Sequence, residues 1–315
     1  RGGREGNNAF VGDLNEPYGF DTSFYEKLST MDVDPHMIDV LQAKMGNYGN
    51  VLADHVHNSV KSGNSALALH VINSLVKNGG YGFTDTHEIA LKATTAKEVA
   101  QIKRVSVTKK TVGKLVTPLF CACINPNRAV LEKLLEICPE YTFPDETLRK
   151  PVHYAAACSG PGPLEVLAEK GVDMREGDQL GITPLMIAAI YGRAKNIKFL
   201  LEKEERSNIN AKTKEGMMAI HLAAMMGHTD CIKELLKKGA LINAPGRFRM
   251  TPLIFAAAYG HLDCVKYLHE NKARILGKDK LKRTALTMAV KNGNARIVSY
   301  LLANGADFTQ ADSSN

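Results

Sequence analysis

Apolar residues in the second half of the chain come in short runs that a turn interrupts. The stretch TPLIFAAAYGHLDCVKYL, Thr251 to Leu268, begins with Thr-Pro and continues with an alanine-rich apolar run. It breaks at Gly260-His261 and resumes with apolar residues three and four positions apart. Apolar residues at that spacing share one face of an α-helix. The pattern therefore predicts two short helices joined by a turn.

The same pattern recurs in five other segments. They are TPLFCACINPNRAVLEKLL from Thr117, PVHYAAACSGPGPLEVLAEKG from Pro151, TPLMIAAIYGRAKNIKFLL from Thr183, MAIHLAAMMGHTDCIKELL from Met218 and TALTMAVKNGNARIVSYLL from Thr284. Counted from the Thr position, where Lys150 and Met218 stand in for Thr, the repeats start at residues 117, 150, 183, 218, 251 and 284. A fixed period of 33 to 35 residues indicates stacked units that bury a core only against their neighbours.

This period, with the words Thr-Pro-Leu, Ala-Ala, Gly-His, Leu-Leu and Gly-Ala, resembles the ankyrin repeat. About six regular copies cover residues 117–308, and one or two degenerate copies precede them. The resemblance implies an all-α fold: a solenoid of stacked helix-turn-helix units with short β-hairpin-like loops.

The residues of the repeat have physical reasons of their own. A Thr before each first helix accepts from free backbone N–H groups, and Pro at the first helical position loses no needed donor. Small residues let neighbouring inner helices approach, and the glycine after them can adopt the positive φ that ends a helix. The small pairs are Ala155-Ala156, Ala188-Ala189, Ala223-Ala224 and Ala256-Ala257, and the glycines are Gly192, Gly227, Gly260 and Gly293. The outer helices supply a wall of larger apolar residues: Leu131, Leu134, Leu135, Ile197, Leu200, Leu201, Ile232, Leu235, Leu236, Val298, Leu301 and Leu302.

Four segments are expected along the chain. Residues 1–50 form an N-terminal arm, partly disordered, with one short helix that Asp34 caps and Gly46 ends. Residues 51–116 hold the degenerate repeats, 117–308 the regular repeats and 309–315 a tail. The chain begins with RGGREG rather than methionine, so we expect it to be a fragment of a longer polypeptide.

Composition favours a protein of the cytoplasm or the nucleus. No apolar run approaches the roughly 18 residues of a membrane span, and no signal peptide is visible. The six cysteines have no paired spacing, which fits a reducing compartment better than a disulfide framework.

The sequence predicts no catalytic site, metal or cofactor. Cys121 and Cys123 are spaced like metal ligands, but no His or Cys partner lies at ligand spacing and Cys123 occupies an alanine position of its repeat. No phosphate-binding loop, zincin helix, nucleophile elbow, kinase signature or dinucleotide fingerprint appears. The ankyrin resemblance implies structural roles for the repeat histidines, which are His153, His221, His228 and His261.

A concave binding face is the remaining candidate. In an ankyrin-like stack, the two residues after each Ala-Ala pair and the loop tips before each Thr position line one side. The central repeats would present Ile190, Tyr191, Met225, Met226 and Tyr259 there. Tyr offers rigid contact area and Met offers adaptability, as an interaction surface needs. The alternative is that several of these side chains pack between repeats.

The loop tips add positive charge. Thirteen of the 40 basic residues fall in five tips: Lys109, Lys110, Lys114, Arg149, Lys150, Lys212, Lys214, Arg247, Arg249, Lys278, Lys280, Lys282 and Arg283. A basic rim around an apolar floor favours an acidic partner. We take Lys114, Arg149, Lys214, Arg247, Phe248, Lys280 and Arg283 as rim contacts. The alternative is that the lysines only keep loops soluble. Nucleic acid is disfavoured because the floor lacks a run of aromatics and the net charge of +7 is modest.

Two functions remain open. The first is an adaptor or scaffold that binds an acidic protein segment with hydrophobic anchors. The second is the substrate-recruiting or regulatory region of a larger enzyme, such as a tankyrase-like ADP-ribosyltransferase or a kinase, whose catalytic domain lies outside this stretch. Ser106 in KRVSV follows Lys103 and Arg104 at the spacing of a basophilic kinase site and is a possible phosphorylation site.

Overall fold

The computed structural model describes residues 89–90, 93–102, 118–137, 144, 148–203 and 209–307. The expected arm at 1–50 and the tail at 309–315 lie outside the described residues, as does most of the segment 51–116 that is expected to hold the degenerate repeats. The chain divides into two compact units, Arg1–Tyr154 and Ala155–Asn315. Within the described part of the chain no helix is long and apolar enough to cross a membrane.

Short helices make up the described part of both units, with no strand among those residues. They are α7 (Ala96–Val99), α8 (Pro118–Ile124), α9 (Arg128–Ile137), α10 (Pro151–Ala157), α11 (Gly162–Glu169), α12 (Pro184–Ile190), α13 (Ala194–Lys203), α14 (Ala219–Met225), α15 (Thr229–Lys237), the 3-10 turn η4 (Arg247–Arg249), α16 (Pro252–Ala258), α17 (Leu262–Glu270), α18 (Ala285–Lys291) and α19 (Ala295–Ala303). The division between the units falls inside α10, after Tyr154.

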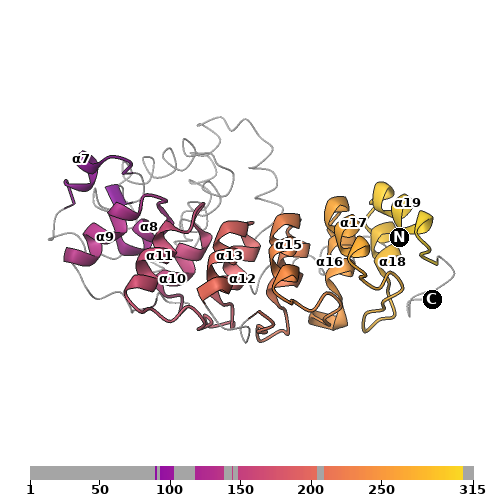
Figure 1. Ribbon diagram of the computed structural model, residues 1–315. Helices are drawn as coiled ribbons and strands as arrows, with labels where there is room; N and C mark the ends of the chain where they lie inside the picture. Colours follow the sequence, from indigo (N-terminus) through magenta and orange to yellow (C-terminus); the bar gives the residue numbers. More distant parts are fainter. Residues whose placement is uncertain are drawn as a thin grey trace, which may run out of the picture. The chain divides into compact units, whose positions relative to one another are not determined.

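The second unit is a stack of helix pairs. Its inner helices contact one another in chain order, α12 with α14, α14 with α16 and α16 with α18. The outer helices α13, α15, α17 and α19 follow in the same way, and each contacts the inner helix of its own repeat. Figure 1 shows the pairs following one another in the order of the sequence. The predicted all-α solenoid of helix-turn-helix units is confirmed.

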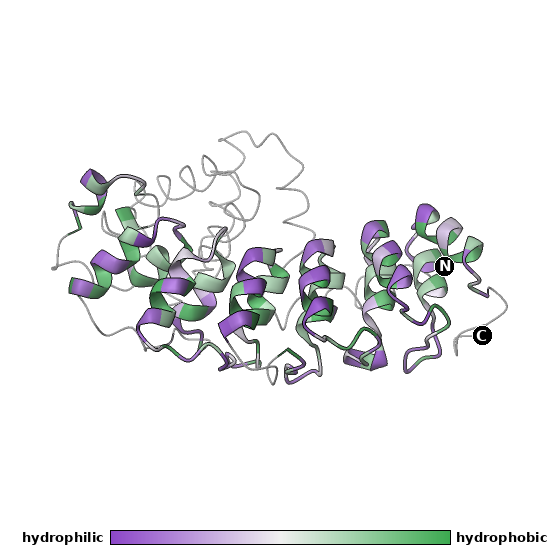
Figure 2. Cartoon of the chain, viewed as in Figure 1, coloured by the Kyte–Doolittle hydropathy of each residue, from purple (hydrophilic) through white to green (hydrophobic). Residues whose placement is uncertain are grey.

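The core lies between the two rows of helices. Figure 2 shows hydrophilic and hydrophobic residues on different sides of outer helices such as α13 and α15. The predicted apolar wall is buried at Leu131, Leu134, Leu135, Ile197, Leu200, Ile232, Leu235 and Leu301. Leu302 departs from that prediction, because it is 43% exposed on the last outer helix.

The inner helices begin as their sequence predicts. The hydroxyls of Thr183 and Thr251 accept from the N–H groups of Met186 and Ile254, at 3.3 and 3.4 Å. Thr284 does the same for α18. Met218 has no side-chain oxygen to cap α14. At this helix start the Nδ1 atom of His221 instead accepts from the Met218 N–H at 3.1 Å.

The far ends of the inner helices are capped by the following repeat. A short helix leaves its last carbonyls without partners inside the helix. In the repeats that start at residues 183, 218, 251 and 284, the residue ten positions after the start has a side-chain donor that reaches back to the preceding inner helix. The pairs are Arg193 Nε to the Ala157 carbonyl at 2.8 Å, His228 Nε2 to Ile190 at 3.0 Å, His261 Nε2 to Met225 at 2.9 Å and the Asn294 amide to Ala257 at 2.9 Å.

Two glycines make room for these histidines. Gly192 and Gly227 have φ of 69° and 76°, a region that favours glycine. A Cβ atom on Gly192 would lie 2.8 Å from Nδ1 of His228, and one on Gly227 would lie 2.5 Å from Nδ1 of His261. Glycine is therefore favoured at these two positions for two reasons. The backbone has a positive φ, and the histidine of the next repeat occupies the space of a Cβ atom.

The same capping occurs in the described part of the first unit. There the side-chain amides of Asn125 and Asn127 donate to the Ala93 carbonyl at 3.0 and 3.3 Å. The ring centroids of Phe120 and Tyr154, also in this unit, lie 4.6 Å apart.

The loops between repeats are closed by backbone hydrogen bonds. The N–H groups of Asp178, Thr213, Gly246 and Asp279 each donate to the carbonyl four residues later, at 2.8 to 2.9 Å. Neighbouring loops are also joined, because the Lys214 N–H donates to the Leu180 carbonyl at 2.9 Å and the Lys280 N–H to the Phe248 carbonyl at 2.7 Å. These are the β-hairpin-like loops that the resemblance implies.

Ala256→Leu is expected to lower the free energy of unfolding by about 1–3 kcal/mol, because Ala256 is fully buried in α16 and the larger side chain overpacks the inner row. Denaturant unfolding measures the loss. Ala303→Leu is the matched control, since Ala303 is exposed in α19 and should tolerate the same change. An unchanged unfolding midpoint for Ala256→Leu would mean that the repeat register is misplaced.

His221 makes stability depend on pH. Burial lowers the pKa of its ring from 6.5 to about 4. Nδ1 accepts from Met218 while Nε2 donates to the Ala244 carbonyl at 2.9 Å, an arrangement that only the neutral ring can make. Because the folded pKa is depressed, the unfolded chain takes up the proton first. The stabilisation is therefore complete above about pH 6.5 and is lost as the pH falls towards about 4.

His221→Gln is expected to be less stable than the parent chain at pH 7.5, with a gap that shrinks by about 2–3 kcal/mol at pH 4.5. Urea unfolding of both proteins across this range gives the gap, and effects of carboxylates cancel in the comparison. A gap that stays constant with pH would show that His221 keeps the same protonation in both states.

Candidate binding surface

The ends of the inner helices do not form the exposed apolar row that the sequence predicts. Ile190, Tyr191 and Met225 are only 1–3% exposed, so the prediction that they face solvent is wrong. Ile190 and Met225 carry the carbonyls that His228 and His261 cap, and this contact brings the next repeat over them. The alternative of packing between repeats holds for these three residues.

Two of the predicted floor residues remain accessible. Met226 and Tyr259 are partly exposed, and each directly follows its inner helix, eight residues after the start of its repeat. Because α14 and α16 are neighbours in the inner row, these two side chains belong to adjacent repeats. The apolar floor is thus narrower than predicted.

The predicted rim residues differ in exposure and in salt-bridge partners. Lys214 and Lys280 are exposed, and among the described residues neither forms a salt bridge. Arg247 is instead paired with Glu215 at 3.2 Å, and its guanidinium lies over the Phe248 ring, 4.9 Å from the centroid. Arg149, in the first unit, is half-buried. Lys114, Lys109, Lys110 and the possible phosphorylation site Ser106 lie outside the described residues.

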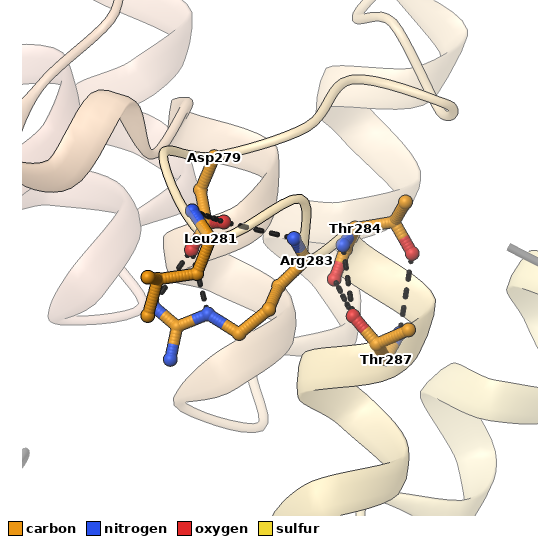
Figure 3. A network of polar contacts seen from close by, with 5 residues as sticks. All are labelled: Asp279, Leu281, Arg283, Thr284 and Thr287. Carbon is orange, nitrogen blue, oxygen red and sulfur yellow. Dashed lines mark hydrogen bonds and ion pairs between the residues drawn. The ribbon is translucent and has the colours of Figure 1, made fainter. Parts of the chain in front are cut away.

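Arg283 is not available to a partner, which corrects its assignment to the rim. Its side chain is 6% exposed and that of Asp279 is fully buried, and the two form an ion pair at 2.6 Å. Figure 3 shows the contacts of Asp279 with Leu281 and Arg283, and its carboxylate also accepts from the N–H groups of these two residues at 2.8 Å each. A buried charge requires such pairing, so the guanidinium of Arg283 is committed to Asp279 inside the loop.

The Asp279 loop has a counterpart three repeats earlier without the ion pair. Asp178 occupies the same position, five residues before the Thr position, and accepts from the N–H groups of Leu180 and Ile182 at 2.9 Å each. Ile182 stands where Arg283 stands in the later repeat. The aspartate therefore shapes the loop by itself, and the arginine is an addition in the last repeat.

Sequence reasoning missed an exposed apolar residue of the loop tips in the second unit. Leu281 is 45% exposed and Phe248 is 40% exposed, and both stand three residues before the Thr position of their repeats. The shared position was the signal that could have identified Leu281, since Phe248 was already a candidate.

The thiols that resembled a metal pair are packed into α8. Cys121 and Cys123 are buried, and burial raises the pKa of Cys121 to about 12. Over the described ranges, no three residues among His, Cys, Asp and Glu come together as metal ligands would. A protonated, buried thiol acts as a small apolar side chain in the core.

Stacked helix pairs with hydrogen-bonded loops define a repeat protein. Its sequence matches the family model described as ankyrin repeats (3 copies) over residues 152–246 and 240–312, about half of the chain. The chain belongs to the ankyrin repeat family, a non-catalytic module in proteins of many kinds.

Several curated proteins resemble the chain over these repeats. It is 33% identical over 283 residues to a poly [ADP-ribose] polymerase tankyrase of Caenorhabditis elegans, across 80% of the chain and 12% of that protein. It is 34% identical over 101 residues to the human ankyrin repeat and SOCS box protein 3, across 29% of the chain and 20% of that protein. It is 37% identical over 92 residues to the human transient receptor potential cation channel subfamily A member 1, across 29% and 8%. The chain thus spans a small part of each relative.

Asp279→Asn is expected to lower the free energy of unfolding by about 3–5 kcal/mol, because it leaves the buried Arg283 charge without its partner. Asp178→Asn, the matched control, should cost only about 1 kcal/mol, since no arginine is left behind. Adding Arg283→Ile to Asp279→Asn should recover part of the loss, because Ile182 fills that position in the earlier loop. Equal losses for the two single variants, measured by denaturant unfolding, would contradict the role assigned to the ion pair.

Proposed function

We propose that the chain is a protein-interaction module that binds an acidic protein segment on the side formed by the loop tips and the ends of the inner helices. The observation that carries the proposal is the set of exposed cations on the loop tips of the second unit. The tip residues are Lys212, Lys214, Arg249, Lys278, Lys280 and Lys282, all exposed. A surface of one charge sign attracts a partner of the other sign and speeds its association.

The apolar part of the proposed contact lies at Met226 and Tyr259. Both are partly exposed on adjacent repeats, directly after the inner helices α14 and α16. Aromatic and methionine side chains at the centre of an interface supply much of its binding energy. An acidic segment with apolar anchors therefore fits this surface better than a purely charged one.

Nucleic acid fits this surface less well. Single-stranded nucleic acids bind to grooves in which several aromatic rings stack on successive bases. The partly exposed Tyr259 follows an inner helix and the exposed Phe248 lies in a loop tip, so the two rings come from different parts of the repeat.

Five cysteines in the described residues are buried free thiols. This state supports a reducing compartment, so we assign the module to the cytoplasm or the nucleus.

Met226→Ala and Tyr259→Ala are each expected to weaken binding of an acidic partner by about 1 kcal/mol or more, mainly through faster dissociation. Lys214→Glu and Lys280→Glu should instead slow association and flatten its dependence on salt, since exposed charges are screened within about 10 Å at 0.1 M salt. The partner is isolated by crosslinking from cells that express the chain, and surface plasmon resonance with the purified pair gives the rates.

All four variants should unfold at the midpoint of the parent chain, which separates binding from folding. Lys198→Glu, on the exposed side of the outer helix α13, is the matched charge control. A partner that binds all four variants like the parent chain would place the binding site elsewhere.

A second candidate follows from the similarity to the Caenorhabditis elegans tankyrase, which covers 80% of the chain. We propose as the alternative that these repeats recruit substrates for an ADP-ribosyltransferase carried by the same polypeptide. The complete gene product, assayed for transfer of ADP-ribose from NAD⁺, tests this. Loss of transfer to the isolated partner in Met226→Ala and Tyr259→Ala, with automodification unchanged, would support recruitment by this surface.

A further inference from the structure

Two neighbouring loop tips in the second unit carry large apolar side chains in solvent. Phe248 is 40% exposed and Leu281 is 45% exposed. Exposed apolar side chains are common on proteins when they are scattered singly, but adjacent ones mark an interaction site. The other exposed large apolar residues of the described ranges, such as Leu241 and Leu276, stand at other positions of the repeat.

A backbone hydrogen bond holds the two tips together. The N–H of Lys280, the residue before Leu281, donates to the carbonyl of Phe248 at 2.7 Å. Standard backbone dimensions then place the Cα atoms of Phe248 and Leu281 within roughly 10 Å of each other. One apolar side chain of a ligand can contact both residues at that separation.

Each tip is also fixed by its own contacts. Phe248 and Arg249 have φ of 52° and 61°, and the Arg247 guanidinium covers one side of the Phe248 ring. On the other tip, the buried carboxylate of Asp279 accepts from the Leu281 N–H (Figure 3). A surface that is ordered before binding loses less entropy when a ligand arrives.

The charges around the two tips are not balanced. Arg249, Lys280 and Lys282 are exposed, and no described acidic residue forms a salt bridge with any of them. The other two arginines of these loops are already paired, Arg247 with Glu215 and Arg283 with Asp279. The tips therefore present a net positive charge on both sides of an apolar pair.

We propose that Phe248 and Leu281 form an anchor site for an acidic peptide that crosses the two tips. One aliphatic or aromatic side chain of the peptide contacts both residues, and carboxylates on either side of it pair with Arg249, Lys280 and Lys282. The inference rests on the proposed acidic partner, and it moves the main apolar anchor from Met226 and Tyr259 to the loop tips.

A peptide fits the two tips better than a nucleic acid strand does. Stacking of bases requires aromatic rings, and Leu281 has none, so only one of the two apolar residues offers a π face. An aliphatic side chain of a peptide can use both residues equally.

The test uses displayed libraries of twelve-residue peptides with acidic flanks, one with a central Leu or Phe and one with a central Ser. We expect the purified chain to enrich only the library with the apolar centre. Fluorescence anisotropy with a selected, labelled peptide then gives affinities. Phe248→Ser and Leu281→Ser should each weaken binding at least fivefold, and Leu241→Ser and Leu276→Ser, at similarly exposed leucines, should change it less than twofold.

The variants separate this inference from the broader proposal. Selected peptides that bind Phe248→Ser and Leu281→Ser normally but lose affinity for Tyr259→Ala would overturn the anchor site and leave the proposed function standing. Failure of both libraries to yield a binder would overturn both. A labelled oligothymidylate that binds through Phe248 and is insensitive to Leu281→Ser would also overturn the anchor site, in favour of nucleic acid. Thermal unfolding of every variant confirms that it is folded.

Discussion

Capping of one inner helix by the following repeat, as at α12, α14 and α16, is the interaction on which the second unit depends. An inner helix of seven residues, such as α12 or α14, satisfies few of its own carbonyls. A buried carbonyl without a partner costs about 1–3 kcal/mol. His228 and His261 remove that cost for the helices before them. No repeat is therefore complete by itself, which gives a physical reason for the nearest-neighbour stability of such stacks.

This capping also explains which side chains lose contact with water. The capping donor must reach the last turn of the preceding helix, so the residues that end this helix lie beneath the next repeat. Ile190 and Met225 are buried for this reason. Met226 and Tyr259 are one residue further along the chain and stay partly exposed. Tyr191 occupies the same position in its own repeat and is only 2% exposed, so the position in the repeat does not by itself decide the exposure of this side chain.

The sequence predicted the repeat, its period, the threonine caps and the glycines that end the inner helices. Each of these features depends on residue types that recur at fixed positions. It did not predict the accessible surface equally well. Whether Tyr191 faces water depends on how closely the next repeat approaches, and no residue type encodes that distance. Likewise, a count of basic residues does not show that Arg283 is neutralised by Asp279. The spacing of Asp279 and Arg283 carries that signal only once the loop is known to bring them together.

The side chains at the loop tips are not fixed by the capping that orders the inner helices. Their backbone is held by an aspartate that stands five residues before the Thr position at Asp178 and Asp279, and by hydrogen bonds between neighbouring loops. The side chain three residues before that Thr position is Leu180, Glu215, Phe248 or Leu281 in successive repeats, and of these Glu215 is paired with Arg247 of the next loop. A rigid backbone with a variable side chain allows partner preference to change without loss of stability. Because Phe248 and Leu281 are exposed where Glu215 is paired with Arg247, the last two tips differ in chemistry from the one before them. The stack therefore uses different residues for folding and for partner preference. The donor ten residues after the Thr position holds the repeats together. The side chain three residues before the Thr position is free to vary with the partner.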